Sequence, residues 1–138
     1  MIIAEIKNGI VIDHIPAGSG MKLYNYLKLS ELDCQIALIE NATSSKYGQK
    51  DILKIGDILD LNYDILGYIA PQITVNIIRN GERVEKVHPE LPVKITDIIQ
   101  CKNPRCITSI EQELPHIFKL TDREKGIYRC IYCETKAE

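Results

Sequence analysis

Apolar and β-branched residues occur in short runs along the first ninety residues, separated by polar or glycine-containing segments. Runs of this length, bounded by turn-forming residues, are typical of strands. The predicted strands are residues 10–15, 34–40, 51–55, 72–79 and 82–88. The last two flank Asn80-Gly81. Asn-Gly between two alternating runs indicates a hairpin, because a type I′ turn needs positive φ at both central residues.

Two segments between these strands are predicted to be short helices. The first begins at Ser19, its expected N-cap, and runs to about Lys28. The second covers Asp60 to Gly67 and is expected to end at that glycine. Polar residues 41–49 predict an exposed loop. The resulting order, β-α-β-β-α-β-β, predicts an α+β fold: a ferredoxin-like antiparallel sheet with two helices on one face.

A proline-bracketed segment, His88–Pro92, predicts a domain boundary, because it is too stiff to join either neighbouring sheet. The predicted domains are therefore residues 1–92 and 93–138. Within the second, the apolar runs predict short strands, which makes it a small all-β domain. These runs are residues 107–110, 115–120 and 127–129. They are too few to bury a self-sufficient core in about 45 residues.

Four cysteines of the second domain have the spacing Cys101-x4-Cys106, then 23 residues, then Cys130-x2-Cys133. Two short Cys–Cys loops can supply the four ligands of tetrahedral zinc, and four thiolates leave no position for a catalytic water. The spacing therefore predicts one structural Zn²⁺, in a domain of the zinc-ribbon or rubredoxin-like kind. An iron–sulfur cluster uses the same ligands with other usual spacings, and free or disulfide-linked cysteines are a further alternative. Cys34, in an apolar run, is expected to be a buried small hydrophobe.

Composition and charge narrow the possible functions. Hydrophobic residues make up 45% and charged residues 26% of the chain, as in ordinary globular proteins. No apolar run approaches the roughly 18 residues of a membrane span, and the N-terminus lacks a secretory pattern, so a cytoplasmic protein with reduced thiols is expected. Residues 1–92 carry 9 basic and 12 acidic residues, and residues 93–138 carry 8 and 7. Neither half has the basic excess typical of nucleic-acid-binding proteins.

Three segments, taken with the cysteine spacing, resemble the regulatory chain of aspartate carbamoyltransferase. They are Gly9–Ala17, Lys50–Ile55 and Tyr68–Asn76. The resemblance runs in order over essentially the whole chain. It implies a non-catalytic subunit in pyrimidine biosynthesis whose first domain binds CTP or ATP as allosteric effectors and pairs into a homodimer. It also implies that the zinc domain contacts the catalytic chain, so that regulatory dimers bridge catalytic trimers.

The same resemblance implies which residues bind the nucleotide. Asp13 and Lys54 correspond to contacts with the ribose region, and Lys86 corresponds to a phosphate contact. The positions of the base pocket are Ile6, Val11, Asn76 and Ile78, with His14 and Lys50 nearby.

Strand alternation supports part of this site and opposes part of it. Lys50 and Lys54 are expected to share one face of their strand, where they can attract a polyphosphate or simply be solvated. Asp13 either accepts hydrogen bonds from a ribose or lies at an exposed edge, and His14 is expected to point to the opposite face. A two-residue turn at Asn80-Gly81 sets residue 76 opposite residue 85. Asn76 and Lys86 are therefore expected on different faces.

Two other functions are compatible with parts of the sequence but are opposed by other features of it. A zinc-ribbon nucleic-acid-binding module is opposed by the low net charge and by Phe118 being the only aromatic residue besides tyrosine. A small enzyme using Asp13 and His14 is opposed by their adjacency, because neighbouring strand residues point away from each other. Neither a nucleic acid nor a membrane is expected as a partner.

Overall fold

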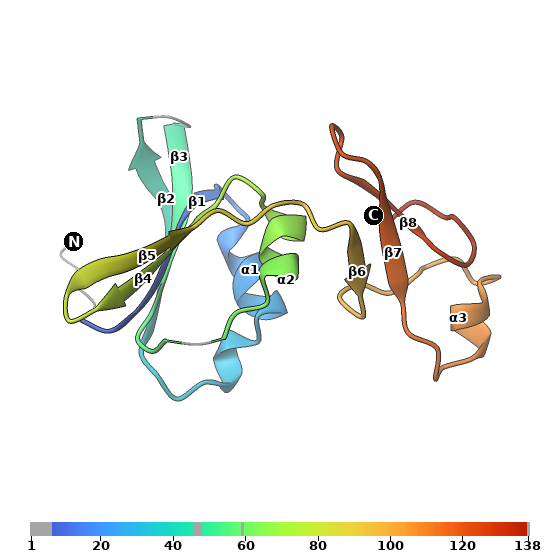
Figure 1. Cartoon of the computed structure of the whole chain (residues 1–138), viewed down its shortest axis with the longest axis horizontal. Coiled ribbons are helices and arrows are strands. Elements are labelled where there is room, and N and C mark those ends of the chain that lie inside the picture. Colours follow the sequence, from blue (N-terminus) through green and yellow to red (C-terminus); the bar gives the residue numbers. More distant parts are fainter. Residues whose placement is uncertain (1–6, 46–47, 59, 138) are drawn as a thin grey trace. The chain divides into compact units, whose positions relative to one another are not determined.

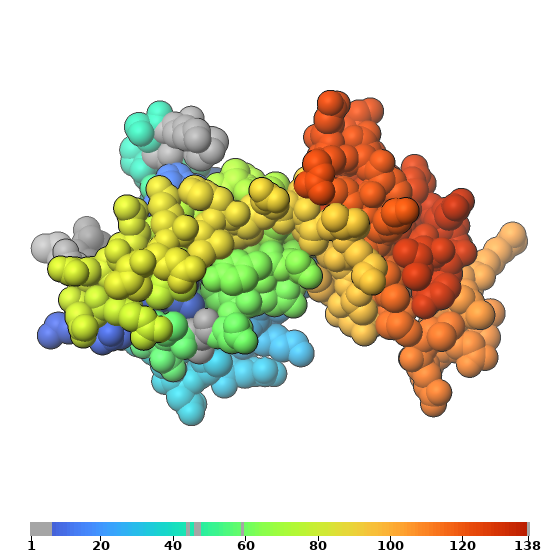
Figure 2. Space-filling view, viewed as in Figure 1, coloured from blue at the N-terminus to red at the C-terminus, as the bar shows by residue number. Residues whose placement is uncertain are grey.

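The computed structural model describes residues 7–45, 48–58 and 60–137. The chain forms two compact units, Met1–Glu90 and Leu91–Glu138 (Figure 1 and Figure 2). No helix of the described residues combines the length and the apolar character that crossing a membrane requires.

The first unit is an antiparallel sheet of five strands in the order β2-β3-β1-β4-β5. Its strands are β1 (Gly9–Pro16), β2 (Ile36–Ser44), β3 (Gly48–Ile55), β4 (Thr74–Arg79) and β5 (Glu82–Val87). The helices α1 (Gly20–Tyr26) and α2 (Tyr63–Ile69) lie on one face of this sheet (Figure 1), with the 3-10 turn η1 (Leu29–Glu31) following α1. The arrangement confirms the predicted α+β fold.

The core of the first unit lies between the sheet and its helices. The alternation predicted for β3 is confirmed, because Asp51, Leu53 and Ile55 are buried while Lys50 and Lys54 on the other face are half-buried. The fully buried apolar side chains are contributed by both layers. They include Ile10, Ile12, Leu53, Ile55 and Val75 from the strands, and Leu23, Leu29 and Leu66 from the helical layer.

Asp51 is the one charged residue of the described chain that is buried. Its Oδ2 accepts hydrogen bonds from the backbone N–H groups of Gly18 (3.1 Å) and Gly20 (2.9 Å), and its Oδ1 accepts one from Asn41 (3.0 Å). A buried carboxylate is tolerated when such donors satisfy it. Asp51 therefore joins the β1–α1 turn to β2, a role that its alternation in the sequence did not reveal.

The prediction of an exposed loop at residues 41–49 is wrong in its extent, since β2 continues to Ser44 and β3 begins at Gly48. The pairing of β2 with β3 shifts register between Ile39 and Ala42, and Asn41 has a φ of 58° there. Asn41 can occupy this bulge because asparagine tolerates the left-handed region better than most residues. The strand therefore continues through polar residues that were expected to form a loop.

The helix ends also differ from prediction. Ser19 does precede α1, but its side chain makes no capping bond, whereas the Asn62 side chain accepts from the N–H groups of Asp64 and Ile65 at the start of α2. Gly67 does not end α2; it is buried inside the helix. A Cβ on Gly67 would lie 1.9 Å from the carbonyl oxygen of Glu90, so the glycine is required by close packing.

The second unit contains a three-stranded antiparallel sheet in the order β6-β7-β8. The strands are β6 (Lys94–Thr96), β7 (Ile117–Asp122) and β8 (Ile127–Cys130). The strand predicted at residues 107–110 is wrong, because these residues form a short helix, α3 (Ile107–Ile110). The chain turns there around Cys106, whose carbonyl accepts from the Ser109 N–H, and the Ser109 hydroxyl donates to the carbonyl of Asn103. The unit is therefore not purely β.

Candidate functional site

The four predicted metal ligands converge in the second unit. Cys101 and Cys106 bracket the loop before α3, while Cys130 ends β8 and Cys133 lies in the turn after it. Their sulfur atoms all lie within 4.8 Å of one another. The Sγ–Sγ distance is 3.5 Å between Cys101 and Cys133 and 3.7 Å between Cys106 and Cys130. These distances exceed the roughly 2.05 Å of a disulfide.

Two threonine hydroxyls lie against the sulfur atoms. The Thr108 hydroxyl donates to Cys106 Sγ at 3.1 Å, and Thr135 Oγ1 lies 3.2 Å from Cys133 Sγ. Hydroxyl groups at this distance stabilise a thiolate and orient it as a ligand. Sequence reasoning missed both threonines, although each follows its cysteine by two positions.

The two neighbouring thiols Cys101 and Cys133 differ in proton affinity. Burial raises the pKa of Cys101 to about 12, with its contact to Cys133 adding to the increase. Burial also acts to raise the pKa of Cys133, but hydrogen bonds with Thr135, Asn103 and Cys101 together lower that pKa to about 6. A bound cation favours the thiolate form of all four sulfurs. The donor set therefore fits a thiolate-binding metal ion.

The first unit brings together a second set of predicted residues, on the sheet face away from the helices. Lys54 of β3 is directly opposite Val11 of β1, Val11 is opposite Asn76 of β4, and Asn76 is opposite Lys86 of β5. The Asn76 side chain donates to the Val11 carbonyl at 3.2 Å. Four candidate residues from four strands therefore form one row, which we call the outer row.

The prediction that Asn76 and Lys86 lie on different faces is wrong. The pairing of β4 with β5 shifts register between Ile77 and Ile78. Ile77 is opposite Glu85 and Ile78 is opposite Arg83, which leaves Val84 as an extra residue in β5. One extra residue reverses the alternation beyond it, so Lys86 joins the face of Asn76.

A second bulge brings Asp13, His14 and Lys50 together beside the outer row. Lys50 Nζ lies 2.9 Å from Asp13 Oδ1 in an ion pair. The pairing of β1 with β3 shifts register between Ile12 and Ile15, and His14 has a φ of 61°. His14 Nδ1 lies 3.2 Å from the hydroxyl of Thr74, the residue opposite Asp13. The expectation that His14 points away from Asp13 is therefore wrong, because the bulge interrupts the alternation.

Two base-pocket candidates remain. Ile78 is half-buried, lies two residues beyond Asn76 on β4, and is opposite Gly9. It thus extends the same face toward the N-terminal end of β1. Ile6 lies outside the described residues. The face as a whole carries three lysines, a carboxylate, an amide and apolar side chains, a combination suited to binding an anionic, partly apolar ligand.

Comparison with known proteins finds relatives of both the first and the second unit. Residues 1–90 match the family described as "Aspartate carbamoyltransferase regulatory chain, allosteric domain", and residues 93–138 match its "metal binding domain". An aspartate carbamoyltransferase regulatory chain of Clostridium botulinum is 54% identical over 134 residues, covering 97% of this chain and 92% of the relative. The corresponding chain of Clostridium tetani is 52% identical over 135 residues, covering 97% and 94%.

A relative from Bifidobacterium longum with the same description is 46% identical over 138 residues, covering 100% of this chain and 99% of its own length. The agreement thus extends over both units, and the four cysteines lie within the residues that match the metal-binding domain. The chain belongs to the family of aspartate carbamoyltransferase regulatory chains, non-catalytic subunits that consist of an allosteric domain followed by a metal-binding domain.

Proposed function

We propose that this chain binds CTP and ATP on the outer face of its five-stranded sheet and transmits their effect to the catalytic chain of aspartate carbamoyltransferase. One structural zinc ion in the second unit stabilises the surface that contacts that catalytic chain. Regulatory chains pair as homodimers and bridge catalytic trimers in the cytoplasm. The outer row is the single observation that carries the nucleotide assignment.

The outer row has the dimensions and chemistry of a nucleotide site. Lys54 and Lys86 are separated by three strand spacings, about 14 Å in all, which is comparable to the length of a nucleoside triphosphate. Lys86 at one end can neutralise phosphate charge, and Lys54 at the other end can donate to ribose hydroxyls. Between them lie the apolar side chain of Val11 and the Asn76 amide, whose nitrogen is already bonded to the Val11 carbonyl. The amide oxygen can then accept from the exocyclic amino group that cytosine and adenine both carry.

Asp13 and Lys50 extend the proposed site along the same face. Their ion pair holds the carboxylate near the outer row in the absence of ligand. Asp13 Oδ2 also accepts from Lys50 Nζ at 3.2 Å and keeps a second lone pair for a ribose hydroxyl, while Lys50 supplies a further positive charge to the phosphates. His14 and Ile78 are proposed to border the nucleotide, as is Ile6.

The sulfur geometry supports a single tetrahedral ion such as zinc over a multi-iron cluster. Four sulfurs at about 2.3 Å from a tetrahedral zinc ion are about 3.8 Å apart, close to the observed 3.5 and 3.7 Å. A multi-iron cluster would hold the sulfurs further apart, because several iron and sulfide ions lie between them. A single ion with four thiolate ligands has a closed coordination sphere, which suits a structural role.

The proposal is tested with the full chain and the catalytic chain from the same source. Calorimetric titration of the regulatory chain with CTP and with ATP should show binding of each. Mixing the two chains should give a stable assembly whose carbamoyltransferase activity changes when CTP or ATP is added. The coupling free energy expected for such regulation is about 1–3 kcal/mol. An assembly whose activity is the same with and without saturating nucleotides would contradict the proposal.

A further inference from the structure

Four basic residues form a continuous row across the sheet of the second unit. Lys94 of β6 is directly opposite Lys119 of β7, and Lys119 is opposite Arg129 of β8. Arg129 is in turn opposite Lys136 in the segment after the last cysteine. All four side chains are exposed. We call this set the basic row; sequence analysis missed it because its members are distributed over more than forty residues of a nearly neutral domain.

The basic row is unfavourable for the stability of the isolated chain. Like charges directly opposite each other on neighbouring strands repel, and the row contains three such pairs. Among the described residues, none of the four forms an ion pair with a carboxylate; Arg129 instead donates to the backbone carbonyl of Glu134 at 3.1 Å. A row of like charges that no ion pair of the described residues neutralises indicates an anionic partner outside the chain.

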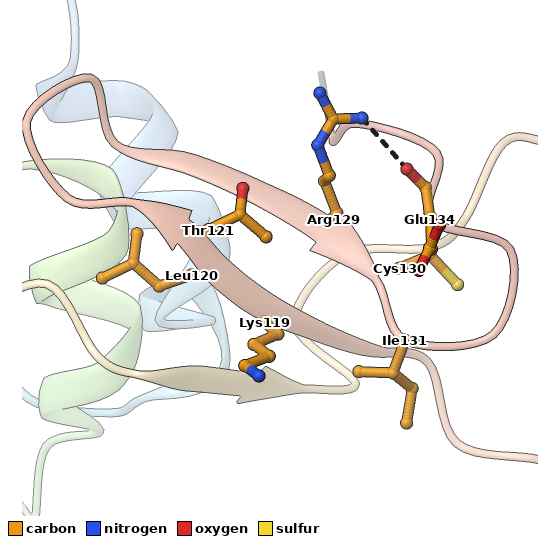
Figure 3. A pocket seen from close by; sticks show the side chains of 7 residues that line it. All are labelled: Lys119, Leu120, Thr121, Arg129, Cys130, Ile131 and Glu134. Atoms are coloured by element: carbon orange, nitrogen blue, oxygen red, sulfur yellow. Dashed lines mark hydrogen bonds between the residues drawn. The ribbon is translucent and has the colours of Figure 1, made fainter.

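The surface around the row favours a polypeptide partner over a nucleic acid. Lys119 and Arg129 line a pocket of about 640 Å³, shown in Figure 3, together with the aliphatic Leu120 and Ile131 and one acidic residue, Glu134. Ile131 is 45% exposed. None of the seven lining residues is aromatic, so the pocket offers no platform on which a base can stack. Cations beside an exposed aliphatic side chain suit a segment in which carboxylates alternate with apolar residues.

We propose that the basic row is the docking surface for a carboxylate-rich segment of a partner polypeptide. The proposal rests on the proposed function, in which that polypeptide is the catalytic chain. The row supplies long-range attraction and the pocket around Ile131 supplies apolar contact. The partner's carboxylates neutralise the row, so that docking removes the electrostatic repulsion that destabilises the free chain.

The variant Lys119→Glu tests the proposal through two effects of opposite sign. In the free chain the new carboxylate faces Lys94 and Arg129, so the unfolding temperature of the second unit should rise. In the assembly the same carboxylate faces the partner's acidic segment, so association should weaken by about tenfold or more. The salt dependence of association should also become shallower. Lys125→Glu, an exposed charge reversal in the β7–β8 turn outside the row, is the control and should change the affinity by less than about threefold.

The possible outcomes distinguish failure of the proposed function from failure of the role given to the basic row. Wild-type chain that carries its metal but does not associate with the catalytic chain would contradict the proposed function. Wild-type chain that associates, with Lys119→Glu associating equally well and with the same salt dependence, would overturn only the role of the basic row. Binding of the wild-type chain to a single-stranded DNA oligonucleotide at 150 mM salt, lost in Lys119→Glu, would overturn it in favour of a nucleic-acid partner.

Discussion

Asn76 of β4 and Lys86 of β5 stand directly opposite each other on the outer face of the five-stranded sheet. A regular two-residue hairpin would set Asn76 opposite residue 85 and turn Lys86 toward the helices. The extra residue, Val84, is 55% exposed and shifts the register by one. The bulge therefore decides whether the proposed site has a positive charge at this end, although Val84 itself contacts no proposed ligand.

Substitution of Lys86 tests the outer row most directly. Lys86→Ala should weaken the binding of CTP and of ATP by about 10- to 100-fold, because one charge-assisted hydrogen bond to a phosphate is lost. Lys86 is exposed and does not pack in the core, so the fold should be retained. The measurement is calorimetric titration of the full chain. Lys22→Ala, an exposed lysine of α1 in the helical layer, is the control and should bind both nucleotides as the wild type does.

Much of the first unit could be predicted from periodicity. The alternation along β3 correctly assigned Lys50 and Lys54 to one face and Leu53 and Ile55 to the other. The errors occur where one extra residue interrupts a ladder, as at Asp13-His14 and at Val84. A bulge depends on the pairing of two strands, and the pattern within one strand does not contain that information.

In the second unit, too, the sequence predicts some features and leaves others undetermined. The spacing of the cysteines sufficed to predict the cluster, because metal coordination imposes short loops between paired ligands. The four apolar and hydroxyl residues of α3 fit a strand as well as a helix, and the turn around Cys106 decides between the two. The basic row arises from strands whose register the sequence did not specify.

Loss of the metal should unfold the second unit while sparing the first. Structural zinc contributes about 10–16 kcal/mol to the folding of small domains, and the second unit has few other buried side chains. Cys101→Ser should therefore abolish metal binding and remove amide-exchange protection from β7 and β8, while nucleotide binding is retained. Metal analysis and hydrogen exchange provide the measurement. Cys34→Ser, outside the cluster, should keep the metal; equal protection of β7 in wild type and Cys101→Ser would refute the structural role.

The buried carboxylate of Asp51 should be important for the stability of the first unit. Asp51→Asn keeps the shape of the side chain but turns an NH2 group toward backbone N–H donors that the carboxylate now satisfies. A destabilisation of about 2–4 kcal/mol is expected, because at least one buried donor loses its acceptor. The free energy of unfolding in urea measures this destabilisation, and faster hydrogen exchange of the β3 amides locates it in the first unit. The exposed Asp33, changed to Asn, should leave the stability unchanged within about 0.5 kcal/mol.

Gly67 in α2 offers a test in which packing and helix propensity predict opposite signs. Alanine in a helix interior is normally more stable than glycine by about 0.5–1 kcal/mol. Here the added Cβ would lie 1.9 Å from the carbonyl oxygen of Glu90, which must then move away from the helix. Such overpacking typically costs about 1–3 kcal/mol, so Gly67→Ala should lower the unfolding temperature of the first unit.

The propensity effect is isolated by Asn25→Ala, because alanine also raises the helix propensity at this exposed position of α1. This control should be neutral or slightly stabilising in the same unfolding measurement. If Gly67→Ala were as stable as Asn25→Ala, the segment around Glu90 would not be packed against α2. A lowered stability of Gly67→Ala alone would instead identify backbone contact as the reason for glycine in a helix interior. The end of the first unit would then be fixed by its contact with α2, at the residue where the chain passes into the metal-binding unit.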